Sequence, residues 1–305
     1  MIGDAVISEY SKITIQGEIK EKVYLETSKK SIDISQNHWL LCIEPVIFGV
    51  WIEKDEFKPA LMKSREYKIY FNSCDIERTR KKPLAELTLH FFDCIEEING
   101  TLLLLKLEKS KIHHLNFLKT YLLFSRYYKK NGLTFSKFKS FVSAYSYPRR
   151  IRIISFRQDD YYNIFPMDLL GDIEQSNRYV FGLRHTNLAL DGIIKTGKLV
   201  VSEVPYEYKD IIYQLGKHHS SKPPPLASLP FKLVQSKNFK FYIPAWAESY
   251  KEIQILKTLD LGSHMLLWGE SNEKNMLNKP ANHLFLIHFL QYLRQKMDSS
   301  VYDLA

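Results

Sequence analysis

The sequence lacks any long hydrophobic run and has only three cysteines among its 305 residues. Uninterrupted apolar stretches such as residues 102–105 are far shorter than the roughly 20 residues that cross a bilayer. Cys42, Cys74 and Cys94 make an odd count without C-x-x-C spacing, which argues against a disulfide framework and a structural zinc site, and we expect reduced thiols. The first residues show neither a basic start nor an apolar segment, so we expect a cytoplasmic protein.

Two common catalytic signatures are also missing. The sequence has no G-x-G-x-x-G turn and no G-x-S-x-G elbow, which removes the usual sequence evidence for a Rossmann domain or an α/β-hydrolase. Residues 192–198 nearly complete a phosphate-binding P-loop, but Leu199 occupies the Ser/Thr position and a strand-forming Val200-Val201 follows it. The helix that a P-loop requires is therefore absent from this pattern.

The charge is basic but evenly spread. A formal net charge of +9 would suit a nucleic-acid partner, yet residues 1–147 hold 23 Lys+Arg against 18 Asp+Glu, so neither half concentrates the excess. We interpret the densest basic run, residues 78–82, as a solvated loop, with a polyanion site as the alternative. We expect no nucleic-acid partner, no membrane partner and no metal. His113-His114 and His218-His219 are interpreted as solvated histidines, although the second pair could instead lie near an anionic ligand.

Strands outnumber helices and do not alternate with them, which predicts a mainly β (α+β) fold with an antiparallel barrel. Predicted strands are residues 68–71, 85–92, 101–107, 150–156, 179–183, 199–204, 253–259 and 264–270. Predicted helices begin near residue 113, with Leu115, Leu118 and Leu122 on the apolar face, near 135, 188, 208 and again from 282. Residues 145–148 break the helical pattern, so we expect an N-terminal α+β domain of unknown role over 1–145 and a barrel domain over 146–305.

Polar and charged residues follow two predicted strands of the second half. Arg184 and Thr186 can meet phosphate oxygens after one strand, although the residues alone equally fit a surface arginine and a threonine that begins a helix. Residues 163–168 follow another strand, and Pro166 predicts a loop there whose free N–H groups could contact the edge of a ring. Phe165 and Met167 could flank such a ring, although core packing is the expected fate of either alone.

Five short blocks in this half resemble the flavin reductase-like family of FMN-binding split β-barrels. They are Pro148 to Ile151, Asp160 to Asn163, Arg184-His185-Thr186, Thr196 to Ser202 and Gly262-Ser263-His264, with Ser202 and Ser263 where the family usually has Asn and Asp. The resemblance covers residues 146–270 and implies FMN as cofactor, with NAD(P)H as reductant and hydride transfer to the flavin. It implies a homodimer, with His264 orienting the nicotinamide or donating a hydrogen bond near the flavin. The implied cofactor contacts are Asn163, Ile164, Phe165, Pro166, Met167, Asp168, Arg184, Thr186 and Asn187. The alternative is a non-catalytic protein that binds a flavin or another ligand on the same barrel.

Overall fold

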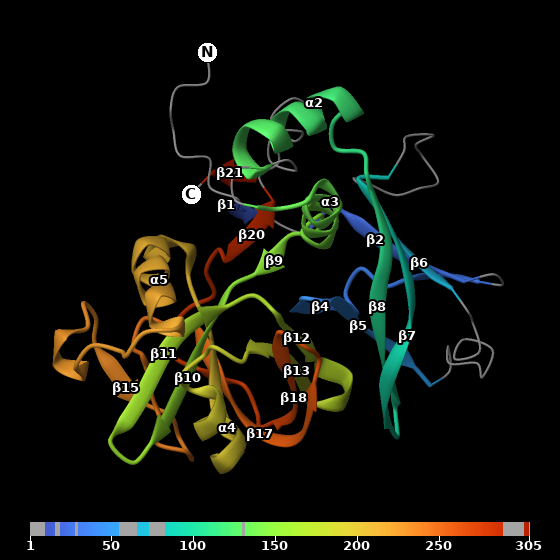
Figure 1. Ribbon diagram of the computed structural model, residues 1–305. Coiled ribbons are helices and arrows are strands. Elements are labelled where there is room, and N and C mark those ends of the chain that lie inside the picture. The colour runs from blue at the N-terminus through green and yellow to red at the C-terminus, as the bar shows by residue number, and fades with distance from the viewer. Residues whose placement is uncertain are drawn as a thin grey trace. The chain divides into compact units, whose positions relative to one another are not determined.

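The computed structural model describes residues 10–15, 19–27, 30–54, 66–72, 83–129, 132–288 and 302–304 (Figure 1). The chain divides into two compact units. The first contains Met1–His38, Val46–Arg149 and Leu286–Ala305, and the second contains Trp39–Pro45 and Arg150–Phe285. Strands predominate among the described residues, which confirms the predicted mainly β class. Cys74, residues 78–82 and the continuation beyond residue 288 of the helix predicted from 282 lie outside the described residues.

The first unit is built on an antiparallel sheet with the strand order β3-β2-β6-β7-β8-β5, and only His38 of strand β4 belongs to this unit. The long β7–β8 hairpin dominates it, and its turn consists of Ile98 and Asn99. Buried and exposed residues alternate along β2 and β6, whereas β5 is buried on both faces. The strands are β2 (Lys22–Glu26), β3 (Ser31–Asp33), β4 (His38–Ile43), β5 (Val46–Glu53), β6 (Tyr67–Asn72), β7 (Ala85–Glu97) and β8 (Gly100–Ile112).

Helices α2 (Phe117–Leu123), its π-helical continuation η2 (Phe124–Tyr128) and α3 (Phe135–Ala144) complete this unit. Phe124 and Tyr128 pack with Phe138 and Val142 into one aromatic cluster. The predicted apolar face of the first helix is wrong, because Leu118 and Leu122 are 71% and 66% exposed. Phe124 and Tyr128 of η2 turn toward the core instead, so tertiary packing outweighs the local pattern.

A smaller four-stranded sheet follows the order β21-β1-β20-β9. The helix predicted from residue 282 is not present over the described residues, which form a strand from Leu284 to His288. Ile287 and His288 are buried there, so pairing into a sheet overrides the helical spacing of the leucines. The strands are β1 (Tyr10–Ile15), β9 (Arg149–Arg150), β20 (Leu284–His288) and β21 (Tyr302–Leu304).

The second unit is built on an antiparallel sheet with the order β11-β10-β14-β17-β18-β13-β12, and β19 pairs with β17. Each strand predicted in this part of the sequence is found, with ends that differ by a few residues. The β-branched runs fill its interior, as Ile153, Val200 and Ile253 are fully buried. The strands are β10 (Arg152–Gln158), β11 (Tyr161–Met167), β12 (Leu170–Ile173), β13 (Arg178–Arg184), β14 (Lys198–Glu203), β17 (Ser249–Asp260), β18 (His264–Ser271) and β19 (Asn275–Met276).

Short helices and one hairpin lie outside this sheet. The predicted helices at 188 and 208 correspond to α4 (Leu190–Thr196) and α5 (Lys209–Leu215). The segment after α5 contains only two 3₁₀ turns, η6 (Gly216–His219) and η7 (Leu226–Ser228), before the hairpin of β15 (Leu233–Gln235) and β16 (Tyr242–Pro244). Further 3₁₀ turns are η4 (Glu174–Ser176) and η5 (Tyr206–Tyr208). None of the helices in the described ranges is long and apolar enough to cross a membrane.

A buried ionic network lies in the same unit. The Glu203 carboxylate, at the end of β14, accepts from Arg152 Nε at 2.6 Å and pairs with Arg150 Nη2 at 2.9 Å. Asp172 Oδ2 accepts from the Tyr179 hydroxyl at 2.7 Å and from Lys251 Nζ at 2.9 Å. Each carboxylate therefore has a cationic partner, as buried charges require.

Candidate functional site

Arg184 and His264 lie side by side where β13 ends and β18 begins. The register of the two strands makes them direct partners, with Arg184 exposed and His264 only 1% exposed. His264 Nδ1 is 2.8 Å from the Ser263 hydroxyl, which accepts the Glu44 N–H at 3.1 Å. His264 Nε2 is buried without a hydrogen-bond partner among the described residues. Polar atoms this deeply buried normally have a partner, so Nε2 is available for a ligand.

His264 is a neutral imidazole at physiological pH. Burial is the main reason that its pKa is lowered to about 4, and the nearby Arg184, His219 and His185 contribute to the same shift. Two of these neighbours, Arg184 and His219, also influence each other, since Arg184 adds to the burial that lowers the pKa of His219. The three side chains therefore form one cluster, and its only permanent charge is the Arg184 guanidinium.

Asn187 fixes the orientation of His219. Its Oδ1 accepts the Ala189 N–H at 2.9 Å, so its amide nitrogen must point the other way, toward His219 Nδ1 at 2.9 Å. Because an amide nitrogen only donates, Nδ1 of His219 accepts and Nε2 carries the proton. The depressed pKa of His219, from burial and then from Arg184, keeps this neutral tautomer. His219 thus presents one N–H donor to its surroundings.

Residues 163–167 form part of strand β11, not the predicted loop. β11 is the edge strand of the sheet, and it pairs with β10 through a two-residue turn that closes at Gln158 and Tyr161. Such a closing pair exchanges both hydrogen bonds, and bonded pairs then alternate, which places Pro166 opposite Ile153 at a non-bonded position. The proline nitrogen faces the open edge, so the strand tolerates it without losing a ladder bond.

The 3₁₀ turn η6 lies along this open edge. The Asn163 amide donates to the His218 carbonyl at 3.1 Å, and the His218 ring bonds the Ile164 backbone while burial lowers its pKa. Asn163 Oδ1 is buried without a partner among the described residues. Since His218 and His219 are adjacent, this one turn connects Asn163 of β11 with Asn187 after β13. Two segments that the sequence analysis singled out are therefore brought together through a third.

The other residues predicted to contact the cofactor differ in the solvent exposure of their side chains. Thr186 is exposed two residues beyond Arg184, and Asp168 and Pro166 are half-buried. The side chains of Ile164, Phe165 and Met167 are core residues, with 1%, 1% and 9% exposure. Only the backbone of β11 at these three positions can contact a ligand.

Sequence reasoning missed the roles of Ser263 and of the turn η6 with His218 and His219, called the histidine turn below. His218-His219 was recognised as a pair without an assigned partner, and the signal available was its position in a helix-terminating segment rich in proline. Ser263, next to His264, holds the imidazole through its hydroxyl. No group of three His, Cys, Asp or Glu side chains in the described part of the chain could hold a metal ion.

No family model matches this chain, and no curated protein matches it. Solved structures do match part of it. An FMN-binding protein from Thermus thermophilus is 16% identical, with a TM-score of 0.40, over 46% of this chain and 81% of that chain. BorF, the flavin reductase component of a bacterial two-component tryptophan halogenase, is 10% identical, with a TM-score of 0.41, over 47% and 88%. The NADH:FAD oxidoreductase SgcE6 of Streptomyces globisporus is 13% identical, with a TM-score of 0.41, over 47% and 82%. Because these TM-scores are low, we base the functional proposal on the residues of the site.

Proposed function

We propose that the second unit binds FMN and accepts hydride from NAD(P)H. The observation that carries this proposal is the meeting of Arg184, Asn187, His219 and His264 in one cluster, joined through η6 to Asn163. These residues combine an exposed cation with two buried polar atoms, Asn163 Oδ1 and His264 Nε2, that have no hydrogen-bond partner in the described part of the chain. An anionic ligand with a polar, flat ring needs this combination.

The exposed side of the cluster fits a phosphate group. Arg184 supplies a fork of N–H donors and Thr186 a hydroxyl, and hydrogen bonds from a guanidinium to phosphate are among the strongest in proteins. His219 adds a neutral N–H donor close to Arg184, as the hydrogen bond from Asn187 and the depressed pKa show. A phosphate dianion would therefore meet donors only, with no carboxylate of the cluster opposing it.

The buried side fits the rim of an isoalloxazine ring. Asn163 Oδ1 can accept a hydrogen bond, and His264 Nε2 can donate or accept one according to its tautomer. A flavin rim carries both carbonyl acceptors and an imide donor, so it can satisfy both orphaned atoms. The outward-facing backbone of β11 would be a further contact, where η6 does not already occupy it.

Bound flavin would supply the redox chemistry, taking a hydride from reduced nicotinamide at ring atom N5. The protein then has to hold two rings in contact, and no side chain is required as a general base. In this role, His264 orients one ring through its Nε2 and stays neutral because its pKa is about 4. We further propose a homodimer and a cytoplasmic location, which the family resemblance and the sequence suggest.

Binding without turnover is the second candidate. The observation favouring it is the burial of Ile164, Phe165 and Met167, which leaves only the half-buried Pro166 among the apolar side chains of residues 163–167 to support one face of the ring. A ring held only by its rim would be less well placed for hydride transfer.

The test is a titration of the full chain with FMN and with riboflavin, followed by flavin fluorescence. We expect Arg184→Gln to weaken FMN binding about tenfold and to leave riboflavin binding unchanged, because only FMN has the phosphate. Arg178→Gln is the matched control, since Arg178 begins the same strand but pairs with Glu270 at 2.8 Å. Absence of FMN binding, or equal losses in the two variants, would refute the proposal. Bound flavin that neither NADH nor NADPH bleaches without oxygen would support binding without turnover.

A further inference from the structure

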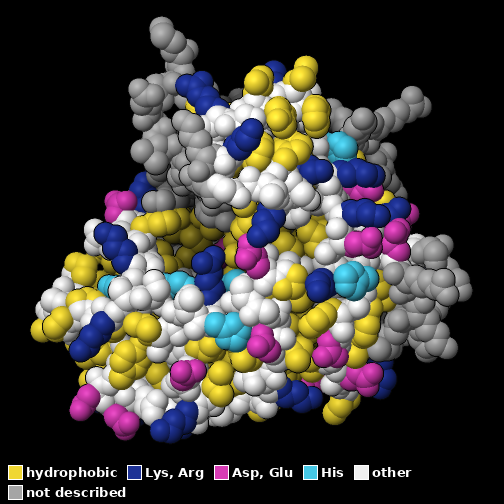
Figure 2. Space-filling model, in the orientation of Figure 1, with side chains coloured by type: hydrophobic (Ala, Val, Ile, Leu, Met, Phe, Trp, Pro, Cys, Tyr) yellow, Lys and Arg dark blue, Asp and Glu magenta, His cyan; other side chains and the backbone are white. Residues whose placement is uncertain are grey.

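Helix α2 of the first unit presents its apolar side to solvent. Phe117, Leu118, Tyr121 and Leu122 are 69%, 71%, 43% and 66% exposed, and the one buried residue of the helix is Thr120. Positions i, i+1, i+4 and i+5 share one side of a helix, so these side chains form a continuous patch. Figure 2 shows hydrophobic side chains gathered at this place, with Lys and Arg side chains beside them. A large apolar patch of this kind marks an interaction surface.

The chain segment that contains the patch carries only positive charge, although two of its lysines pair with carboxylates outside the segment, Lys109 with Glu108 at 3.3 Å and Lys111 with Glu86 at 3.1 Å. No Asp or Glu occurs between Glu108 and Asp159, and the described residues 109–129 and 132–147 contain seven Lys and Arg. Lys119 is exposed within α2 itself, and Lys139 of α3 lies over the Phe135 ring at 5.5 Å instead of beside a carboxylate. The seven are Lys109, Lys111, Lys119, Arg126, Lys129, Lys137 and Lys139.

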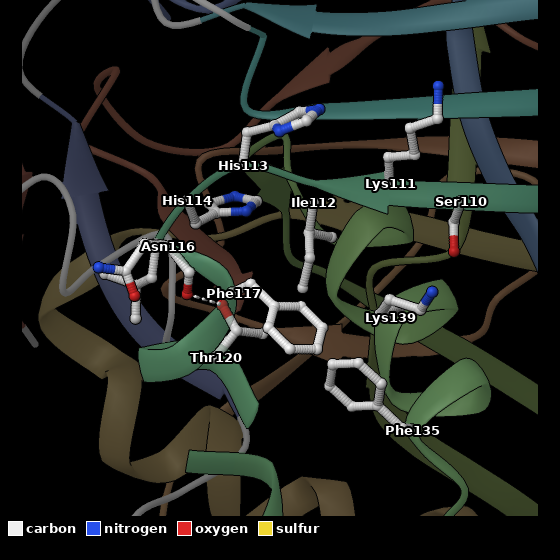
Figure 3. A pocket seen from close by; sticks show the side chains of 11 residues that line it. Ser110, Lys111, Ile112, His113, His114, Asn116, Phe117, Thr120, Phe135 and Lys139 are labelled. Carbon is white, nitrogen blue, oxygen red and sulfur yellow. Dashed lines mark hydrogen bonds between the residues drawn. The ribbon is translucent and has the colours of Figure 1, made fainter. Parts of the chain in front are cut away.

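A hollow of about 730 Å³ opens beside the patch (Figure 3). Phe117 from α2 and Phe135 from α3 lie edge to face at 6.0 Å and form an apolar wall. Ser110 and Lys139 line the same hollow, so it offers a hydroxyl and a cation next to aromatic rings. A phosphate head with an attached apolar chain matches this arrangement.

We propose that the α2 patch, meaning Phe117, Leu118, Tyr121 and Leu122 with the surrounding lysines, docks on an anionic phospholipid surface. A bilayer interface offers acidic head groups and apolar chains together, and aromatic and leucine side chains flanked by Lys and Arg favour that boundary. A nucleic acid would neutralise the charges but would leave Leu118 and Leu122 in water. The proposal differs from the expectation of no membrane partner; docking on a bilayer surface requires no spanning helix, and the described residues contain none.

The experiment is co-sedimentation of the full chain with vesicles of phosphatidylcholine alone or mixed with phosphatidylserine. We expect binding to the mixed vesicles only, weakened by salt. Leu118→Ser with Leu122→Ser should reduce partitioning by about tenfold or more, and Lys119→Gln by about fivefold. The controls are Ile98→Ser, which changes an 82% exposed apolar residue in the β7–β8 turn, and Lys257→Gln on β17, and neither should alter binding.

Several results would overturn the proposal. These are equal binding to the two kinds of vesicle, no vesicle binding, or equal losses in the α2 and control variants. Size-exclusion chromatography of the same samples tests a second copy as the occupant. The patch is an interface between copies of this chain if two results occur together. The wild type is a dimer that does not bind vesicles, and Leu118→Ser with Leu122→Ser converts it to a monomer. Circular dichroism spectra confirm that the variants, all changed at exposed positions, remain folded.

Discussion

Glu203→Gln tests whether the buried ionic network holds the second unit together. The side chain of Glu203 is 12% exposed and lies between Arg152 at 2.6 Å and Arg150 at 2.9 Å. Burial acts to raise the pKa of this carboxyl, but the attraction of the two arginines outweighs it and holds the pKa below its usual range. The neutral amide would leave the 13% exposed Arg152 without its counter-charge.

Removing one partner from a buried pair leaves an uncompensated charge, which costs about 3–5 kcal/mol of unfolding free energy. Glu270→Gln is the matched control. Glu270 also pairs with an arginine, Arg178, at 2.8 Å, but its side chain is 53% exposed. Solvent screens such a pair, so we expect a loss of about 0–1 kcal/mol there. The two variants make the same chemical change and differ mainly in burial.

Urea unfolding followed by tryptophan fluorescence measures both losses, since Trp268 is fully buried in β18 of the same sheet. The depressed pKa of Glu203 determines how its contribution to the free energy of unfolding changes with pH. Its contribution is present above the ordinary value of 4.5 and is lost as the pH falls through the lower folded-state value. The difference in unfolding free energy between the wild type and Glu203→Gln should therefore become smaller at acidic pH. Equal losses for Glu203→Gln and Glu270→Gln, or a gap that stays constant with pH, would refute the reasoning.

Two further perturbations test the packing of each unit. Gly182→Ala should cost about 3 kcal/mol or more in urea unfolding, because a Cβ there would overlap the Leu41 backbone carbonyl, whereas in Gly216→Ala the new Cβ would meet Pro166 Cγ at an ordinary 3.6 Å. Similar losses would contradict this account. His288 is buried with a pKa lowered to about 3, so the unfolded chain takes up a proton that the folded chain does not, and stability falls as the pH drops below about 6.5. His288→Gln should reduce the slope of the unfolding free energy against pH by up to about 1.4 kcal/mol per pH unit. If thermal unfolding of the two proteins is equally sensitive to acid, His288 is not the source of this pH dependence.

The strands of the second unit could be predicted because their signals are local. Ile153, Val200 and Ile253 belong to short β-branched runs bounded by turn residues, and such runs need no knowledge of their neighbours. Pro166 shows where this stops. A proline ends most strands, but β11 keeps it because the strand lies at the edge and the proline nitrogen faces outward. Edge position is a property of the folded sheet, and the sequence does not contain it.

The helix beginning at Phe117 shows the same limit from the opposite side. Leu118 and Leu122 have the spacing of a buried face, yet the aromatic cluster around Phe124 and Phe138 determines which side turns inward. Spacing identifies a face, whereas the choice between two apolar faces depends on which one finds the larger partner. The exposed leucines left by that choice are the basis of the α2 patch.

The candidate site joins residues that are far apart in sequence, and the histidine turn is what joins them. Asn163 and His218 are separated by 55 positions and Asn187 and His219 by 32. Motif order could nominate Asn163, Arg184, Asn187 and His264, because each lies within or directly after one of the short sequence blocks. It could not nominate His219, whose donor atom is defined only once Asn187 has bonded its other nitrogen. The hydrogen bonds of the two adjacent histidines therefore show what their sequence position does not. The orientation of the Asn187 amide decides which nitrogen of His219 donates a hydrogen bond at the site.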